Sequence, residues 1–286
     1  MTTLIRLYSD LHLECGKFKV PKHPQDAETI LILNGDIGER GKPREFVERC
    51  TKQFKFVLYI LGNHEFYGGE YHAVKQYWKD REAENENLFV LDNEVFVHND
   101  VRILGATMWT DLTKGDFLAM EYARRNMNDY HVIDIYNPGE SAYKVQRKLM
   151  PDDTVKFHAA TIAFFKEELA KEFEGTTIVC THFSPSPSLA AGKYAYHPLN
   201  PAFHANCDYM FTEYKIDYWL FGHTHTAINV KLADTYVMSN PRGYVGYESQ
   251  EEVGFDENFV LMVWKRLTNA LNLCILHTEA EKQRFI

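Results

Sequence analysis

The feature that most constrains this 286-residue sequence is a set of mostly apolar stretches that end in metal-ligand side chains. Five stretches, at 3–9, 30–33, 56–61, 177–180 and 218–221, have the length and composition of buried β-strands. The residues that follow them are Asp10 and His12, then Asp36, then Asn63 and His64, then His182, and finally His223 and His225. Because the carboxyl ends of strands in an α/β sheet line one crevice, we expect these side chains to meet.

The remaining pattern predicts an α/β fold. A helix over 42–54, between two apolar stretches, indicates a βαβ unit, and a second helix runs from 151 to Gly175 with Val155, Ala159 and Phe165 on its apolar face. Short strands are expected at 88–91, 95–98 and 101–104, separated by hairpin-type turns, and at 228–232, 235–238 and 259–264. Residues 106–152 are predicted to form a partly helical cap insertion. Without repeats or a linker, we expect one domain over 1–286.

Charge and cysteine content narrow the classes of function. The net charge is −9, from 31 Lys and Arg and 40 Asp and Glu. Because nucleic acid is also negatively charged, this charge does not favour it as a partner. The five cysteines are scattered, which is typical of reduced thiols rather than of an exported disulfide framework. No apolar stretch is long enough to span a membrane and no signal peptide is apparent, so we expect a cytoplasmic protein. The oligomeric state stays open.

The number of candidate ligands predicts two metal ions. Seven ligands are too many for one tetrahedral ion, but they suit two ions that share a bridging carboxylate. Imidazole with carboxylate favours divalent or mixed-valence transition metals, with manganese as the first choice and iron, zinc, cobalt or nickel as alternatives. Two ions about 3.5–4 Å apart stabilise the attacking and leaving oxygens of a displacement at phosphorus, and a hydroxide between them would be the nucleophile.

The blocks DLH (10–12), NGD (34–36), GNHE (62–65), TH (181–182) and GHTH (222–225) resemble the calcineurin-like metallophosphoesterase superfamily, in order and spacing. This resemblance implies a four-layer αββα sandwich of two mixed β-sheets flanked by helices. It also implies that Asp10, His12 and His225 bind one metal ion, that Asn63, His182 and His223 bind the other, and that Asp36 bridges them. His64 would not be a ligand. It would stabilise the transition state or protonate the leaving oxygen.

Five further residues are candidates for contact with substrate or catalytic groups. The stretch GDIGERG (35–41) is similar to GDxxDRG of the protein phosphatases, so Glu39 could orient His64 and Arg40 could bind phosphate. Arg124 and Arg125 in the cap could select substrates, although a solvated helix face explains them equally well. Arg242 lies in NPRGY (240–244), which resembles a segment of bacterial and phage members and could simply shape a turn. The histidines outside the blocks, including His158, are expected on the surface, although His197 and His204, in the loop 183–208, could border the mouth of the site.

We therefore predict a binuclear metal-dependent phosphoesterase that hydrolyses P–O bonds. The second histidine of GHTH favours a phosphodiesterase acting on small or nucleotide-type substrates. A phosphomonoesterase resembling the protein phosphatases is the alternative within this class, and a nuclease is a third option that the net charge disfavours. A non-catalytic scaffold is the alternative from another class, although scaffold members have lost ligands that this sequence retains. The physiological substrate is not readable, because specificity resides in the cap and in the loop 183–208.

Overall fold

Strands buried on both faces form two mixed sheets in the computed structural model, which describes residues 2–39, 41–136, 146–194 and 196–264. The first sheet has the order β13-β1-β2-β3-β4, formed by Leu261–Val263, Thr3–Tyr8, Ile30–Asn34, Phe56–Ile60 and Leu88–Val90. Its four N-terminal strands are parallel, and β13 pairs antiparallel with β1.

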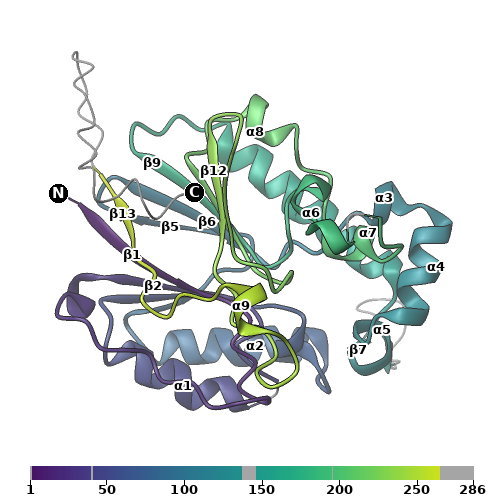
Figure 1. The fold of residues 1–286 in the computed structure, drawn as a ribbon, viewed down its shortest axis with the longest axis horizontal. Helices are drawn as coiled ribbons and strands as arrows, with labels where there is room; N and C mark the ends of the chain where they lie inside the picture. The colour runs from purple at the N-terminus through teal and green to yellow at the C-terminus, as the bar shows by residue number, and fades with distance from the viewer. Residues whose placement is uncertain (1, 40, 137–145, 195, 265–286) are drawn as a thin grey trace.

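The second sheet has the order β11-β12-β10-β9-β6-β5, formed by Ile228–Leu232, Thr235–Ser239, Tyr218–Phe221, Thr176–Thr181, Val101–Ala106 and Glu94–His98. Its four inner strands are parallel, and the edge strands β11 and β5 are antiparallel to their neighbours. Helices α1 (Lys42–Thr51) and α2 (Tyr71–Ala83) cover the first sheet, and α6 (Pro151–Leu169) covers the second, as Figure 1 shows. The predicted helix–sheet–sheet–helix sandwich is confirmed.

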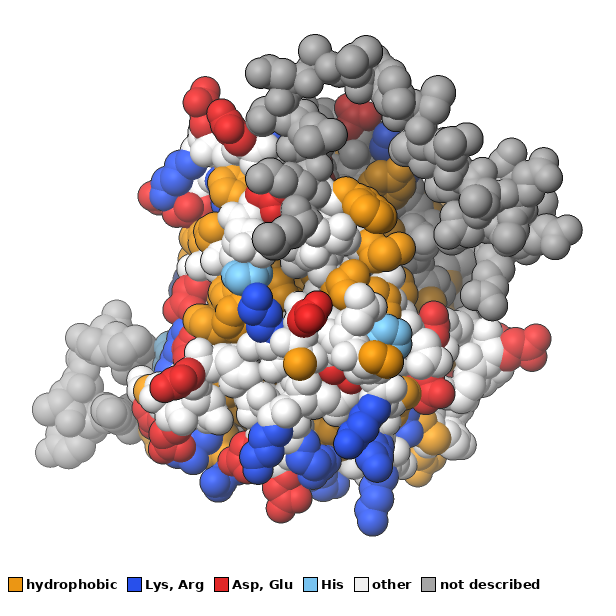
Figure 2. Space-filling model, turned by 90° about the vertical axis from the view of Figure 1, so that its left-hand side faces the viewer, with side chains coloured by type: hydrophobic (Ala, Val, Ile, Leu, Met, Phe, Trp, Pro, Cys, Tyr) orange, Lys and Arg blue, Asp and Glu red, His pale blue; other side chains and the backbone are white. Residues whose placement is uncertain are grey.

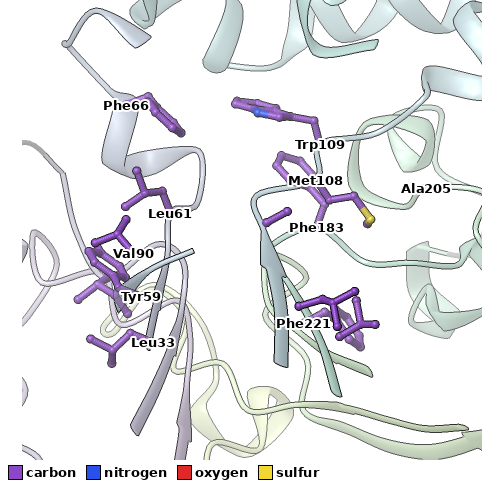
Figure 3. Packing of buried hydrophobic residues seen from close by; sticks show 14 of the residues in the cluster. Leu33, Tyr59, Leu61, Phe66, Val90, Met108, Trp109, Phe183, Ala205 and Phe221 are labelled. Atoms are coloured by element: carbon purple, nitrogen blue, oxygen red, sulfur yellow. The ribbon is translucent and has the colours of Figure 1, made fainter. Parts of the chain in front are cut away.

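Alternate side chains along each strand pack in different layers. Ile30 and Ile32 of β2 belong to the apolar cluster between the two sheets, whereas Leu31 and Leu33 face the helices. Figure 3 shows Leu33 and Tyr59 on the outer side of the first sheet. Each fully buried side chain of this kind contributes about 1.5–3 kcal/mol to the stability of the fold. The two apolar layers therefore fix the positions of the strand ends relative to one another.

We call residues 106–152 the cap, and its described parts, 106–136 and 146–152, lie to one side of the sandwich in Figure 1. The cap contains the short helices α3 (Leu112–Gly115), α4 (Phe117–Asn126) and α5 (Asp129–Val132), followed by the strand pair β7 (Asp134–Tyr136) and β8 (Gln146–Lys148). Farther along the chain are α7 (Asn200–Phe203), α8 (Met210–Glu213) and α9 (Gln250–Val253). Within the described residues, no helix has the length and apolar character needed to cross a membrane.

Three sequence expectations for secondary structure were wrong in detail. The first predicted helix, expected over 42–54, ends at Thr51. Beyond it the chain turns, and Phe54 is buried just before β3. The turn at 92–93 is not a hairpin: β4 pairs with β3 in the first sheet, whereas β5 pairs with β6 in the second. Helix α6 ends at Leu169, before Gly175.

The buried face of α6 also differs from the predicted one. Thr154, His158 and Thr161 are buried, whereas Ala159 is exposed. The two threonines can be buried because partners satisfy their hydroxyls: Thr154 donates to the Pro151 carbonyl at 3.0 Å and Thr161 to Asn93 Oδ1 at 2.7 Å. Hydrophobicity alone therefore placed the face about one residue away from its true position.

Candidate active site

Loops after five parallel strands bring every predicted metal ligand, and His64, to one end of the sandwich. The strands are β1, β2 and β3 of the first sheet and β9 and β10 of the second. In chain order, these loops carry Asp10 and His12, Asp36, Asn63 and His64, His182, and His223 and His225. All of these side chains are buried except that of His225, which is partly buried. Because the two sheets pack against each other, the ends of their strands bring these side chains together, as the sequence pattern predicted.

Asp10, His12 and His225 form one group that could hold a metal ion, with ligand atoms within 4.8 Å of one another. The Nε2 atoms of His12 and His225 are 3.0 Å apart, and His225 Nε2 lies 3.5 Å from Asp10 Oδ1. Two imidazoles and one carboxylate from different loops are a donor set suited to transition metals.

A second group consists of Asp36, His182 and His223, with Asn63 beside it. His182 Nε2 lies 3.3 Å from Asp36 Oδ1 and 3.0 Å from Asn63 Oδ1. The other oxygen of Asp36, Oδ2, lies 3.9 Å from His12 Nε2 in the first group. The two oxygens of Asp36 therefore face the two different groups.

The hydrogen bonds of the ligand histidines fit metal coordination. His12 Nδ1 lies 2.7 Å from Glu14 and His225 Nδ1 lies 2.8 Å from Glu248, so each Nδ1 can donate to a carboxylate and each Nε2 would be the atom that binds a cation. These two Nε2 atoms face each other, an arrangement that a cation between them would stabilise. Buried His223 Nε2 likewise has no partner in the described part of the chain. This donor set therefore fits bound metal ions.

The electrostatics of the cluster lead to the same conclusion. Burial lowers the pKa of His182, but the carboxylate charges of Asp36 and Asp10 outweigh it and raise that pKa to about 9. Burial likewise opposes protonation of His225, yet hydrogen bonds to Asp10 and Glu248 raise its pKa to about 10. In the metal-free protein the carboxylates thus draw protons onto His182 and His225, a compensation that bound cations would supply instead.

The backbone at the ligands adopts an unusual conformation. Five of the seven predicted ligands have positive φ angles: Asp10, His12, Asp36, His223 and His225, at 51°, 42°, 53°, 68° and 47°. Such conformations cost on the order of 1–3 kcal/mol each and persist only where the surrounding structure imposes them. Here the buried strands impose them, although eight other non-glycine residues among those described also have positive φ, so the strain is not confined to the site.

Glu65, the last residue of the GNHE block, joins two of the ligand loops. Its buried carboxylate accepts hydrogen bonds from the backbone N–H groups of Asp36, Ile37 and Gly62, at 3.0, 2.7 and 2.7 Å. The Tyr59 hydroxyl donates to the same carboxylate at 2.7 Å. Sequence analysis assigned no role to this residue, although its position in the block was a signal.

Gly62 is needed because ligand side chains press against its Cα. A Cβ there would collide with the carboxylate of Asp36 and approach the ring of His182 to 2.8 Å. We expect Gly62→Ala to lower metal affinity by about 10–100-fold, the effect typical of disturbing groups that orient ligands. Isothermal titration with Mn²⁺ measures this.

Gly192→Ala is the matched control, because no atom lies within 4 Å of a Cβ built there. Equal metal affinity for the two variants would contradict the steric argument.

His64 is held by groups on all sides of its ring. Tyr67 stacks on it with ring centroids 4.2 Å apart, and the Tyr244 hydroxyl lies 3.1 Å from Nε2. Near Nδ1, a Glu14 oxygen lies at 3.4 Å and a Glu39 oxygen at 3.9 Å, so Glu14 is the nearer carboxylate. Burial opposes protonation of His64, but Asp36 and Glu14 raise its pKa to about 9.

Sequence analysis missed Glu14, Tyr244 and Glu248 as contributors to this site. The signal for Glu14 is its position two residues after His12, on the loop that already carries two ligands. The signal for the other two is that β12 is also a parallel strand whose carboxyl end lies at this edge of the sandwich.

The proposed arginines lie in other environments. Arg124 and Arg125 at the end of α4 pair with Glu121 at 2.7 and 2.6 Å, and Arg125 is largely exposed. The guanidinium of Arg242 donates to the carbonyls of Leu11, Gly16 and Lys17 at 3.1, 2.9 and 3.0 Å. These placements favour a solvated helix face and a turn-shaping residue. Arg40 lies outside the described residues.

A pocket of about 380 Å³ opens beside the donors. The cap contributes Met127 and Asp129 to its wall, and the loop after β9 contributes Leu199, Phe203 and His204. Of the two positions open to His204, the surface and the mouth of the site, the structure has it in the pocket wall with only 4% exposed. His158 was expected on the surface, but it is buried. His204 is accommodated because its Nδ1 lies 2.9 Å from the Ser184 hydroxyl. Among the described residues that line this pocket there is no Lys or Arg.

A sandwich of two mixed sheets, with carboxylates and imidazoles gathered at the carboxyl ends of its parallel strands, defines a metal-dependent hydrolase. The chain belongs to the calcineurin-like phosphoesterase family, whose sequence profile matches residues 4–227. This membership and the donor groups together support a metal-dependent phosphoesterase.

Two known proteins illustrate the relationship. An uncharacterized protein of Acanthamoeba polyphaga mimivirus is 26% identical over 266 residues, which cover 84% of this chain and 91% of the viral protein. The crystal structure of phosphopantetheinyl hydrolase from Mycobacterium tuberculosis superposes with a TM-score of 0.66 at 17% identity, covering 85% of this chain and 90% of that one. At this identity the structural likeness supports the fold.

Proposed function

We propose that this protein is a binuclear phosphodiesterase acting on small or nucleotide-type esters. Asp10, His12 and His225 would hold one ion, and Asn63, His182 and His223 the other, with Asp36 shared between them. The observation that carries this proposal is that the two oxygens of Asp36 face the two groups, at 3.3 Å from His182 and 3.9 Å from His12. Manganese is the first metal to test, followed by iron, zinc, cobalt and nickel.

When bound, the ions would supply an activated water and would stabilise negative charge on the phosphate oxygens. His64 lies on the pocket wall and would give a proton from Nε2 to the leaving oxygen as the P–O bond breaks. The electron pair of that bond stays on the leaving oxygen, and the proton completes the alcohol. The carboxylate of Glu14 near Nδ1 favours the protonated ring that this step requires.

The charge of the pocket supports a diester in preference to a monoester. A phosphomonoester brings about two negative charges near neutral pH, whereas a diester brings one. The described pocket lining contains no Lys or Arg to neutralise the second charge, and buried Asp129 adds a carboxyl group to it. The carboxyl groups of the pocket would therefore repel a monoester more strongly than a diester.

The overall charge gives no support to the nuclease alternative. On the face shown in Figure 2, which lies away from the cap, most Lys and Arg side chains lie along the lower edge with Asp and Glu among them. The net charge of −9 has the same sign as a nucleic-acid backbone.

Hydrolysis of matched esters tests the proposal. We expect metal-stripped protein reloaded with Mn²⁺ to cleave bis(p-nitrophenyl) phosphate faster than p-nitrophenyl phosphate. Release of p-nitrophenolate measures both reactions. His64→Ala should lower the rate by about 10²–10⁴-fold, the usual contribution of a proton-transferring group, when the alcohol is a poor leaving group.

Faster cleavage of the monoester would favour the phosphatase-like alternative. Two bound metal ions per chain without hydrolysis of either ester would contradict the proposal, and absence of metal binding would favour the scaffold alternative.

A further inference from the structure

The segment that follows β12, residues 240–248, contributes to the site although it lies beyond the family-matched residues 4–227. Hydrogen bonds hold it against the ligand loop after β1. The Arg242 N–H donates to the Ser9 carbonyl at 3.1 Å, and the Gly243 N–H donates to the Asp10 carbonyl at 3.0 Å. The segment is therefore fixed to a loop that carries two predicted metal ligands.

Tyr244 of this segment contacts His64 directly. Its hydroxyl lies 3.1 Å from His64 Nε2, and its ring packs on His12 with ring centroids 4.2 Å apart. Glu248 Oε2 accepts the Tyr244 N–H at 2.6 Å and also lies 2.8 Å from His225 Nδ1. One short segment thus contacts the proposed catalytic histidine and two proposed ligands.

A contact with Tyr244 would keep His64 from binding a metal ion. Atoms of His64, His12 and Glu14 lie within 4.8 Å of one another, so His64 could itself become a metal ligand. A hydrogen bond to Nε2 keeps this nitrogen directed at the pocket, while the carboxylate of Glu14 lies near Nδ1 at 3.4 Å. Because Nδ1 makes no hydrogen bond within the described residues, the Tyr244 contact is what holds the Nε2 edge of the ring at the pocket, and the leaving oxygen would replace the hydroxyl as the partner of Nε2 when substrate binds.

We propose that Tyr244 is a positioning residue that directs His64 Nε2 toward the leaving oxygen of the ester. This inference rests on the proposed function, because it assigns to His64 the transfer of a proton to that oxygen. The role depends on the leaving group: p-nitrophenolate departs without a proton, whereas a poorer leaving group needs one in the transition state.

The test compares Tyr244→Phe with wild-type full-length protein, both loaded with Mn²⁺, on the p-nitrophenyl and phenyl esters of thymidine 5′-phosphate. We expect kcat for the phenyl ester to fall by about 10–100-fold and kcat for the p-nitrophenyl ester to change by less than about 3-fold. KM and metal content should stay at the wild-type values. Tyr247→Phe is the matched control, because Tyr247 lies in the same segment and its side chain is largely exposed.

A double-mutant comparison separates positioning from a general structural effect. In a His64→Gln background, Tyr244→Phe should have little further effect, because it acts through the missing imidazole. Equal losses in both backgrounds, equal losses on both esters, or a reduced metal content would overturn the inference. Wild-type protein that cleaves only the p-nitrophenyl ester would overturn it as well, since no proton would then reach the leaving group. Wild-type protein that cleaves neither ester would contradict the proposed function and, with it, this inference.

Discussion

Replacing Asp36 by Asn is expected to reduce ester hydrolysis by at least about 1000-fold, the largest effect of any single substitution considered. The two oxygens of Asp36 face the two donor groups, at 3.3 Å from His182 and 3.9 Å from His12. Asn has the same size as Asp and keeps one side-chain carbonyl oxygen. That oxygen can still accept the hydrogen bond that the backbone N–H of His64 donates to Asp36 Oδ1 at 2.8 Å. The substitution therefore removes the charge while preserving the local shape.

Metal analysis and steady-state kinetics measure the outcome. We expect fewer than two bound ions per chain in Asp36→Asn, together with loss of activity on bis(p-nitrophenyl) phosphate. Asp234→Asn is the control, since the Asp234 side chain is fully exposed in the turn between β11 and β12. An active Asp36→Asn protein with two bound ions would show that no shared carboxylate is needed.

Removal of metal with a chelator is expected to lower Tm markedly as well as to abolish hydrolysis. Asp10 and Asp36 are buried close to each other, and each raises the free-energy cost of ionising the other. Ions that bind only the folded protein stabilise it by about 2.7 kcal/mol when free metal is 100 times its dissociation constant. At about 2–4 °C per kcal/mol, this corresponds to a shift of about 5–10 °C.

Thermal unfolding with and without Mn²⁺ gives this shift, and re-addition of Mn²⁺ to chelated protein should restore it. Asp36→Asn should show a smaller difference between the two conditions, because it binds metal less well. An unchanged Tm in wild-type protein would mean that the donor groups bind no ion at these concentrations.

Much of the site was accessible from sequence because its elements are local. An apolar strand followed at once by ligand side chains is a pattern of a few residues, and it recurs five times. The glycines beside the ligands belong to the same local pattern: Gly35 has φ = 86°, and a Cβ at Gly62 would collide with a ligand. The αββα sandwich followed from the resemblance that these blocks carry, and the structure confirmed it.

Other residues escaped sequence reasoning because their roles depend on contacts between distant segments. His158 looks like a surface residue of an amphipathic helix, yet it is buried in the core. Glu39 has the phosphatase-like spacing, but Glu14 lies nearer to His64. Arg242 was selected within the NPRGY segment, whereas Tyr244, two residues later, contacts His64.

The sequence by itself determined the candidate ligands, because strand hydrophobicity and the residues after each strand are encoded locally. The family and its two-sheet architecture followed from the resemblance that these blocks carry. Only the tertiary structure decided which groups surround those ligands: Glu14 and Glu248 on the ligand imidazoles, Tyr244 on His64, and a pocket wall formed by the cap. The physical reason is that these contacts join residues up to 180 positions apart, so they depend on how the two sheets pack. No short-range pattern records that packing.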